Sequence, residues 1–287
     1  MSLVNLKAML AHAAANHYAV GMFDVSDLEM TRAVVQEAEK LRAPVILGAL
    51  APDLEGDRLD YWFALARLAA EKSATPVCIH LDHANTPEQV RRAAEIGFTS
   101  VMLDASSAPF EENIRRSREV VESVRGRGIT VEAELGHVGN GWVGSGEGSE
   151  SGPDMLTEPE KVAEFVARTG VDALAVSIGT AHGVYIKAPR LDIDRLRKIA
   201  AVAGVPLVLH GGSGTPEDQL RDAIANGIAK INIFSELLTA WNGAMLEELK
   251  ALPHLAAWPS TLRKKPDEAM REVIRGKIRL FGSAGRV

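Results

Sequence analysis

The sequence has one cysteine, no long apolar run and no excess of basic residues. A single cysteine, Cys78, cannot form an internal disulfide, which excludes disulfide-rich secreted folds and suits a reducing cytoplasm. No apolar stretch approaches the ~20 residues that span a bilayer, and residues 1–17 resemble an amphipathic helix without the apolar segment of a signal peptide. The formal net charge is −6, which argues against a basic nucleic-acid-binding surface. We therefore expect a cytoplasmic protein that binds neither membranes nor nucleic acid.

Short apolar segments alternate with amphipathic segments along the chain, and no change in composition divides it. Eight apolar segments read as buried parallel strands, because they are continuous rather than alternating. These expected strands span 18–25, 43–50, 75–83, 98–106, 129–136, 171–179, 205–214 and 228–235. Eight such units in about 230 residues predict a closed (β/α)8 barrel of the TIM type, with a doubly wound open sheet as the alternative. We expect one domain over residues 1–287, with extra helices at both ends.

A predicted helix follows each strand. The expected ranges are about 27–42, 57–73, 86–97, 109–126, 158–169, 192–203, 215–225 and 235–250, and a last helix at about 266–281. Thr86-Pro87 and Thr215-Pro216 read as an N-cap followed by the first helical residue. The segment 136–155 contains seven glycines, which favours a mobile lid near an active site over a plain surface loop.

Polar residues gather at the expected strand ends, and these ends meet at one rim of a barrel. They are Asp82, His83, Glu132, Glu134, His182, His210 and Asn232. Any one histidine in a barrel is more often a hydrogen-bonded core residue than a ligand, and we prefer that interpretation for His80. Three histidines from three strand ends, however, match a catalytic zinc site with an open position, and Glu134 is a candidate fourth or alternate ligand. The four other histidines receive no role: His12, His17, His137 and His254.

The loops after the seventh and eighth strands indicate an anion site. "HGGSGTPED" and "NIFSEL" place small residues and new helix N-termini beside His210 and Asn232. Backbone N–H groups at helix N-termini bind phosphate, and these two loops form the usual phosphate site of this barrel. Glycine-rich turns also serve as simple tight connections. The prediction of a phosphorylated substrate therefore depends on the three histidines at the same end of the barrel as well as on these loops.

A metal, a carboxylate and a phosphate site together suit proton transfer next to a carbonyl group. Asp82 is the candidate for moving the proton. The alternative chemistry for breaking a carbon–carbon bond uses a Schiff-base lysine. The sixth strand has no lysine, and Lys230 lies near the entrance to the eighth strand, which places it too deep in the barrel.

Six segments resemble, in order, those of the class II, zinc-dependent ketose-bisphosphate aldolases, the fructose- and tagatose-bisphosphate aldolase group. They are "HLDHA", "VEAELG", "GTAHGVY", "LHGGSG", "KINIFSE" and "GKIRLFGSAGRV", and the resemblance covers nearly the whole chain. It implies reversible cleavage of a ketose (bis)phosphate to dihydroxyacetone phosphate and an aldehyde, through a zinc-stabilised enediolate. It also implies a homodimer or homotetramer and, near the phosphate, a monovalent cation.

The resemblance also assigns roles to residues. Asp82 becomes the acid/base, His83, His182 and His210 the zinc ligands, and Glu134 part of a second divalent position. The residues matching the grip on dihydroxyacetone phosphate are Gly183, Gly211, Ser213, Asn232 and Ser235, with Gly212, Ile233 and Phe234 lining it.

The sequence departs from this family where the aldehyde half binds. "FDVSD" (23–27) stands where the family has asparagines, and "ALAPD" (49–53) lacks a usual serine. Trp142 lies near the place of the lid glutamate, for which Glu147 or Glu150 are substitutes, and Asp267 replaces an arginine for the distal phosphate, with Lys264 and Lys265 close by. These differences suggest an aldehyde without a terminal phosphate. The alternatives are a non-catalytic sugar-phosphate-binding barrel and a metal-dependent sugar-phosphate isomerase or hydrolase.

Overall fold

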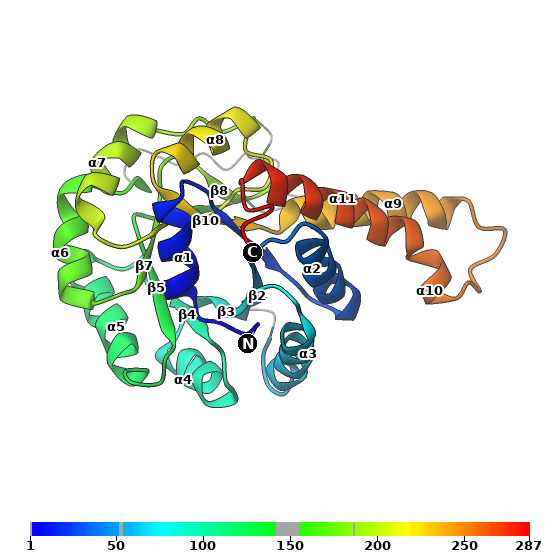
Figure 1. Cartoon of the computed structure of the whole chain (residues 1–287), viewed down its shortest axis with the longest axis horizontal. Helices are drawn as coiled ribbons and strands as arrows, with labels where there is room; N and C mark the ends of the chain where they lie inside the picture. Colours follow the sequence, from blue (N-terminus) through cyan, green and yellow to red (C-terminus); the bar gives the residue numbers. More distant parts are fainter. Residues whose placement is uncertain (1, 52–53, 142–154, 186) are drawn as a thin grey trace.

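The barrel predicted from the sequence is present. The computed structural model describes residues 2–51, 54–141, 155–185 and 187–287. In this part of the chain, eight parallel strands close in the order β1-β10-β9-β7-β5-β4-β3-β2 (Figure 1). They span Val20–Asp24 (β1), Val45–Leu50 (β2), Val77–Ala84 (β3), Ser100–Leu103 (β4), Thr130–Leu135 (β5), Ala173–Val176 (β7), Leu207–Leu209 (β9) and Ile228–Ile233 (β10). Every expected barrel strand is confirmed, and the open-sheet alternative is wrong.

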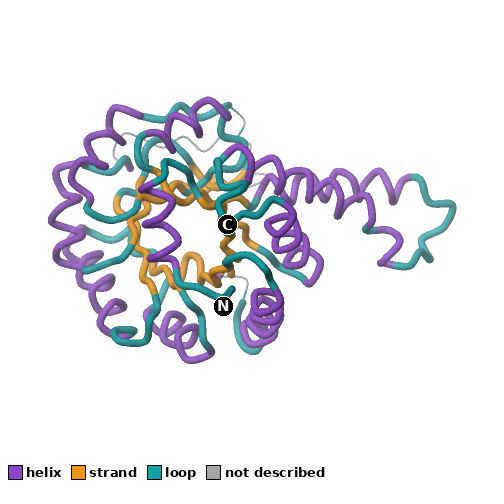
Figure 2. Tube along the Cα trace, in the orientation of Figure 1, coloured by secondary structure: helices purple, strands orange, loops and turns teal. Residues whose placement is uncertain are grey.

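An outer ring of helices covers the strands, as the alternating pattern predicts (Figure 2). The helices span Leu28–Lys40 (α2), Arg58–Lys72 (α3), Pro87–Ile96 (α4), Phe110–Ser123 (α5), Pro159–Thr169 (α6), Ile193–Ala203 (α7), Glu217–Ala225 (α8) and Ser235–Lys250 (α9). The main apolar core lies between this ring and the strands. Because the strands are buried on both faces, their apolar residues run without alternation.

One of the two predicted helix starts is correct and the other is wrong by one residue. Thr86 and Gln89 form a reciprocal capping box with Pro87 in the first turn of α4. Pro216, in contrast, is the N-cap residue of α8 rather than its first residue. The Thr215 hydroxyl donates instead to the Gly211 carbonyl, 3.1 Å away, and so it braces the preceding loop.

Two short strands that the sequence pattern did not predict lie outside the barrel. Gly139–Gly141 (β6) follows β5, and Ala181–Gly183 (β8) follows β7. They pair in parallel, with Asn140 opposite His182. This pairing places the start of the expected lid segment beside a predicted metal ligand, while residues 142–154 of that segment, including Trp142, Glu147 and Glu150, lie outside the described residues.

The expected N-terminal helix closes one end of the barrel. Helix α1 (Leu6–Ala15) buries Leu6, Met9 and Leu10. These side chains pack with the entrance residues of several barrel strands, among them Cys78. In Figure 1, α1 lies across the ring of strands. The opposite end of the barrel, where the strands finish, stays available for a site.

The C-terminal helices form an arm that extends beyond the barrel (Figures 1 and 2). Helix α9 leads outward, a short helix α10 (Pro259–Leu262) follows the turn, and α11 (Lys264–Leu280) returns along α9. Near the tip of the arm, Leu255 is 83% exposed and Trp258 80% exposed. Within the described residues, no helix combines the length and apolar character needed to cross a membrane.

Candidate active site

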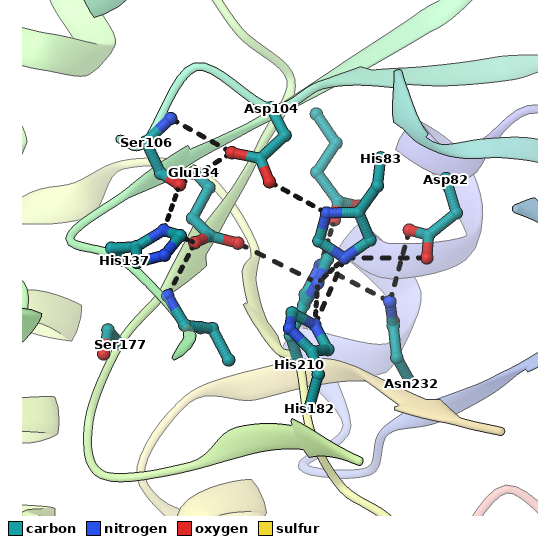
Figure 3. A network of polar contacts seen from close by, with 12 residues as sticks. Asp82, His83, Asp104, Ser106, Glu134, His137, Ser177, His182, His210 and Asn232 are labelled. Carbon is teal, nitrogen blue, oxygen red and sulfur yellow. Dashed lines mark hydrogen bonds and ion pairs between the residues drawn. The ribbon is translucent and has the colours of Figure 1, made fainter. Parts of the chain in front are cut away.

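Three histidines converge at the C-terminal end of the barrel (Figure 3). His83 Nε2 lies 3.2 Å from His182 Nε2 and 2.9 Å from His210 Nδ1. The third edge, His182 Nε2 to His210 Nδ1, is 3.4 Å. Nitrogens bound at the ~2.0–2.1 Å zinc distance of a tetrahedral site lie about 3.3 Å apart. The three ring nitrogens therefore fit one face of a tetrahedral metal site.

A β-bulge brings Asp82 and His83 to the same site. Leu81 pairs with Val101 and Ala84 with Leu103, so β3 has one residue more than β4 between these pairs. In a regular strand, neighbouring side chains would point to opposite faces. The bulge, together with the left-handed backbone of His83 at φ +50°, turns both side chains toward the barrel mouth. A residue other than glycine with a positive φ is uncommon, and such backbone conformations cluster at functional sites.

Two carboxylates orient the histidine rings. Asp104 Oδ2 lies 3.0 Å from His83 Nδ1, and Glu132 Oε1 lies 2.9 Å from His210 Nε2. Each contact leaves the other ring nitrogen facing the cluster, which is the usual arrangement around a metal-bound imidazole. Within the described part of the chain, His182 Nδ1 has no hydrogen-bond partner. Asp104 was not predicted from the sequence, although its place at the end of the apolar run "SVMLD" is a signal.

The charges around the three histidines favour a bound cation. Burial lowers the pKa of His83, but the charge of Asp82, the hydrogen bond that His83 donates to Asp104 and the charge of Glu134 outweigh burial and raise the pKa to about 10. Burial lowers the pKa of His182 to about 3, with help from His83. His83 is therefore the histidine that most favours a positive charge, because the carboxylates of Asp82 and Asp104 lie beside its ring. A metal cation bound to the three ring nitrogens would be stabilised by the same carboxylates.

A second group of ligand atoms adjoins the first. His83, Asp104 and Glu134 offer atoms within 4.8 Å of one another. Glu134 Oε1 accepts a hydrogen bond from Val138 N–H at 2.8 Å, and Oε2 lies 3.9 Å from His210 Nδ1. Burial and the nearby Asp104 carboxylate raise the pKa of Glu134 to about 8. This group matches the expected second divalent position, with Asp104 added to it.

Asp82 lies beside the histidine cluster. Its Oδ2 is 3.8 Å from His83 Nε2, and its Oδ1 accepts a hydrogen bond from Asn232 Nδ2 at 3.3 Å. Burial raises its pKa, but the charge of His83 and the neighbouring His80, whose Nε2 lies 3.7 Å from Oδ1, outweigh burial and keep the pKa well below the ordinary value. Asp82 is thus an ionised carboxylate at the mouth of the barrel, a state suited to accepting a proton.

The loops after β8, β9 and β10 meet beside the histidines. Gly211 has a left-handed backbone at φ +67°, and a Cβ there would collide with the Ala181 carbonyl. Gly212 N–H donates to the Asn232 carbonyl at 3.1 Å. Ser213 Oγ accepts from the N–H groups of Phe234 and Glu236, at 3.1 and 3.3 Å, so it lies at the N-terminus of α9. The structure brings together the residues expected to hold phosphate: Gly183 at the end of β8, Gly211, Gly212 and Ser213 after β9, Asn232 and buried Ile233 on β10, Phe234 at the N-cap of α9, and Ser235 as its first residue.

Comparisons with known proteins agree with this geometry. The family model for class-II fructose-bisphosphate aldolases matches residues 4–286. The chain is 39% identical over 292 residues to a fructose-bisphosphate aldolase from Geobacillus stearothermophilus, covering 100% of this chain and 99% of the relative. The chain belongs to the class-II fructose-bisphosphate aldolase family. It is therefore an aldolase, an enzyme that makes or breaks a carbon–carbon bond.

Solved structures of aldolases superpose on this chain over nearly its whole length. The crystal structure of the YdjI aldolase from Escherichia coli K12 superposes with a TM-score of 0.87 at 35% identity, covering 99% of both chains. A fructose-bisphosphate aldolase from Campylobacter jejuni gives a TM-score of 0.83 at 20% identity, covering 100% of this chain and 97% of that one. The second likeness shows the fold alone.

The buried lysine of this aldolase cannot act as an accessible amine. Lys230 Nζ lies 2.8 and 3.0 Å from the two oxygens of Glu132, and both side chains are fully buried. The expectation that Lys230 lies too deep is confirmed. His80 is also buried, with Nδ1 2.7 Å from Ser100 Oγ, as predicted for a core histidine. His137, given no role from the sequence, contacts Ser106 Oγ, which in turn donates to Asp104.

On the β1 side of the aldolase mouth, charged residues pair with one another. Arg263 Nη2 contacts Asp27 Oδ2 at 3.0 Å, and its Nε contacts both oxygens of Asp267. Asp27 also caps α2, and Asp267 accepts from Trp241 Nε1. The arginine is therefore held between two carboxylates, and this cluster carries a net negative charge.

Proposed function

We propose that this chain is a metal-dependent aldolase that reversibly cleaves a ketose phosphate to dihydroxyacetone phosphate and an aldehyde. The observation that carries the proposal is the triangle of ring nitrogens from His83, His182 and His210, which adjoins the glycine loops after β8 and β9. Zinc is the metal this donor set suits best, since neutral imidazoles with an open position are typical of catalytic zinc. When bound, the metal supplies Lewis-acid polarisation of the substrate carbonyl.

The residues around the three histidine nitrogens have separate roles in proton transfer, substrate binding and metal binding. Asp82, ionised and beside His83, moves the proton on the aldehyde side of the bond that breaks. Asn232 holds Asp82 through its amide N–H, and its Oδ1 has no partner within the described residues, so this oxygen is available to a substrate hydroxyl. Glu134 and Asp104 form, with His83, the second divalent position.

The phosphate of the dihydroxyacetone phosphate half lies at the glycine loops and the N-terminus of α9. The positive φ angles of Gly183 and Gly211 let backbone groups approach a ligand closely, and the positive end of the α9 helix dipole favours an anion. Ser213, Asn232 and Ser235 supply side-chain contacts, and Gly212, Ile233 and Phe234 line the pocket. A monovalent cation beside this phosphate stays a prediction, because none of the described carboxylates is assigned to it.

The aldehyde half has no terminal phosphate in this proposal. The support is the cluster of Asp27, Arg263 and Asp267, in which the arginine is already paired with two carboxylates. Lys265, the second candidate for a phosphate contact, forms an exposed ion pair with Glu248. An anion approaching this side would meet net negative charge.

The enzyme assembles from two or four copies of this chain, through the helical arm. Leu255 and Trp258 near the tip, and Leu246 and Leu249 on α9, expose apolar surface that a second copy would cover. The cytoplasm is the compartment that suits the single reduced Cys78.

A condensation assay tests the proposal. Dihydroxyacetone phosphate is mixed with a panel of phosphorylated and unphosphorylated aldehydes, and the product is followed with zinc, with a chelator, and with zinc restored. We expect chelator-sensitive condensation, with an unphosphorylated aldehyde giving the highest kcat/KM. A best substrate of fructose 1,6-bisphosphate would contradict the aldehyde assignment. Sugar-phosphate binding without any condensation would favour a non-catalytic binder instead.

A further inference from the structure

An ion pair crosses the barrel interior directly below the three histidines. Lys230 lies on β10 and Glu132 on β5, and β9 and β7 separate these strands in the sheet. The two side chains therefore meet across the interior rather than along neighbouring strands. Both are fully buried, and Lys230 Nζ contacts both carboxylate oxygens, at 2.8 and 3.0 Å.

Stability alone does not explain this pair. Removing two charges from water costs several kcal/mol per ion, and well-packed apolar residues often replace buried pairs without loss of stability. The entrance half of the same barrel interior is filled by apolar side chains such as Val20, Met22 and Ile46. A charged pair at the next level, under the site, therefore has another role.

Glu132 also contacts a predicted metal ligand. Its Oε1 lies 2.9 Å from His210 Nε2. Both Glu132 oxygens contact the Lys230 ammonium group, at 2.8 and 3.0 Å, so the carboxylate is held as one half of an ion pair. An ionised carboxylate only accepts hydrogen bonds, so His210 carries its proton on Nε2. In the neutral ring, the lone pair is then on Nδ1, the atom that faces His83 and His182.

Lys230 holds Glu132 in this orientation. His80 Nε2 lies 3.9 Å from Glu132 Oε2 and 3.7 Å from Asp82 Oδ1, and within the described residues it has no hydrogen-bond partner. Without the ammonium group, the carboxylate would be free to turn toward His80, and its contact with His210 would weaken. The two contacts from Lys230 fix both oxygens and so fix which one His210 meets.

We propose that Lys230 and Glu132 are positioning residues that select the His210 tautomer and thereby set the affinity of the three-histidine site for its metal. The inference rests on the metal centre of the proposed function. It assigns a role to a buried lysine that takes no part in covalent chemistry.

The test is zinc affinity in Lys230→Met, measured by competition with a chromophoric chelator, together with the visible spectrum of the cobalt-loaded protein. We expect affinity to fall about 10–100-fold, the usual effect of removing a group that orients a ligand. The matched control is Glu37→Gln, which likewise removes one charge from a buried ion-pair network, in this case a carboxylate between α2 and α11. It should leave zinc affinity within about twofold of wild type, since it lies far from any ligand contact.

A second variant separates metal affinity from folding. Lys230→Met/Glu132→Gln leaves no unpaired buried charge and should fold with near wild-type stability. A glutamine can present either its oxygen or its NH2 group to His210, so ¹⁵N NMR should show mixed His210 tautomers where wild type shows Nε2–H. Zinc affinity should stay at least tenfold reduced. Wild-type affinity, cobalt spectrum and tautomer in both variants would overturn the inference. If wild type binds zinc no better than His210→Ala, the proposed metal centre itself fails.

Discussion

On the β8–β10 side of the barrel mouth, polar groups face the site without internal partners, whereas on the β1 side they pair with one another. His182 Nδ1 and Asn232 Oδ1 have no hydrogen-bond partner within the described residues. Arg263, in contrast, contacts both Asp27 and Asp267. Buried polar atoms without partners are costly, and they persist where a ligand completes them. The comparison indicates that one side of the mouth is built for a phosphate and a metal, and that on the other side Arg263 is already paired with two carboxylates.

The largest effect is expected from Asp82→Asn, on β3 beside the three histidines. An asparagine keeps the shape of the side chain but cannot take up a proton, so kcat should fall about 10²–10⁴-fold. Bound metal should remain stoichiometric, because Asp82 is not one of the three ligands, and this is checked by metal analysis of the purified variant. A fall of less than about tenfold in kcat would remove Asp82 from the role given to it.

A smaller effect is expected from Gly211→Ala, in the loop after β9. The backbone has φ +67°, and the added Cβ collides with the Ala181 carbonyl, so the loop must move. A strain of about 1–3 kcal/mol corresponds to a rise of roughly 5- to 150-fold in KM for dihydroxyacetone phosphate. The control is Gly243→Ala on α9, where a Cβ would meet no atom of the described residues within 4 Å. An equal rise in KM for both variants would contradict a specific role for the loop.

On the β1 side, a substitution can release Arg263 from one of its two carboxylate partners. Asp267→Asn removes one of the two carboxylates that hold Arg263. The released charge should improve kcat/KM for a phosphorylated aldehyde over its unphosphorylated analogue by about tenfold, equivalent to about 1.4 kcal/mol. Lys265→Gln, which removes only an exposed ion pair, serves as the control and should leave the preference unchanged. No change in preference with Asp267→Asn would separate this cluster from aldehyde selection.

The smallest effect on catalysis is expected from Glu37→Gln, which alters stability instead. Burial raises the pKa of Glu37, but hydrogen bonds from Lys40, Arg271 and Arg275 outweigh it and lower the pKa below the ordinary value. A lowered pKa in the folded state stabilises the fold above the unfolded-state pKa, and this stabilisation is lost as pH falls through the folded-state value. The variant should lose about 1.5–3 kcal/mol at pH 7, and the difference from wild type should shrink below about pH 4. Urea unfolding at several pH values measures it, and a difference independent of pH would contradict the assignment.

The barrel and the three histidines were predictable because their signals are local. Each strand is a short apolar run, and His83, His182 and His210 each follow such a run, where the geometry of a barrel brings them together. Strands β6 and β8 gave no such signal. They consist of three residues each, Gly-Asn-Gly and Ala-His-Gly, which have weak strand preference, so tertiary pairing decides their structure.

The supporting residues were less predictable because their partners are distant in the sequence. Asp104 at the end of β4 reads as an ordinary turn residue until His83, 21 positions away, is seen to contact it. Glu132 and Lys230 are 98 positions apart, and their strands are not neighbours in the sheet. Thr215 shows the same limit on a smaller scale, since a hydroxyl that reads as a helix cap contacts Gly211 instead. Contacts across the barrel interior depend on register and closure, which no local pattern encodes.

The most direct measurement mixes the zinc-loaded enzyme with dihydroxyacetone phosphate in deuterated water and follows loss of the pro-chiral C3 hydrogen by NMR. No aldehyde is added, so the result does not depend on the β1 side of the mouth. We predict stereospecific exchange that stops when a chelator removes the metal and returns when zinc is restored. Metal-loaded enzyme that binds dihydroxyacetone phosphate but exchanges no hydrogen would contradict the account of this site as an aldolase centre.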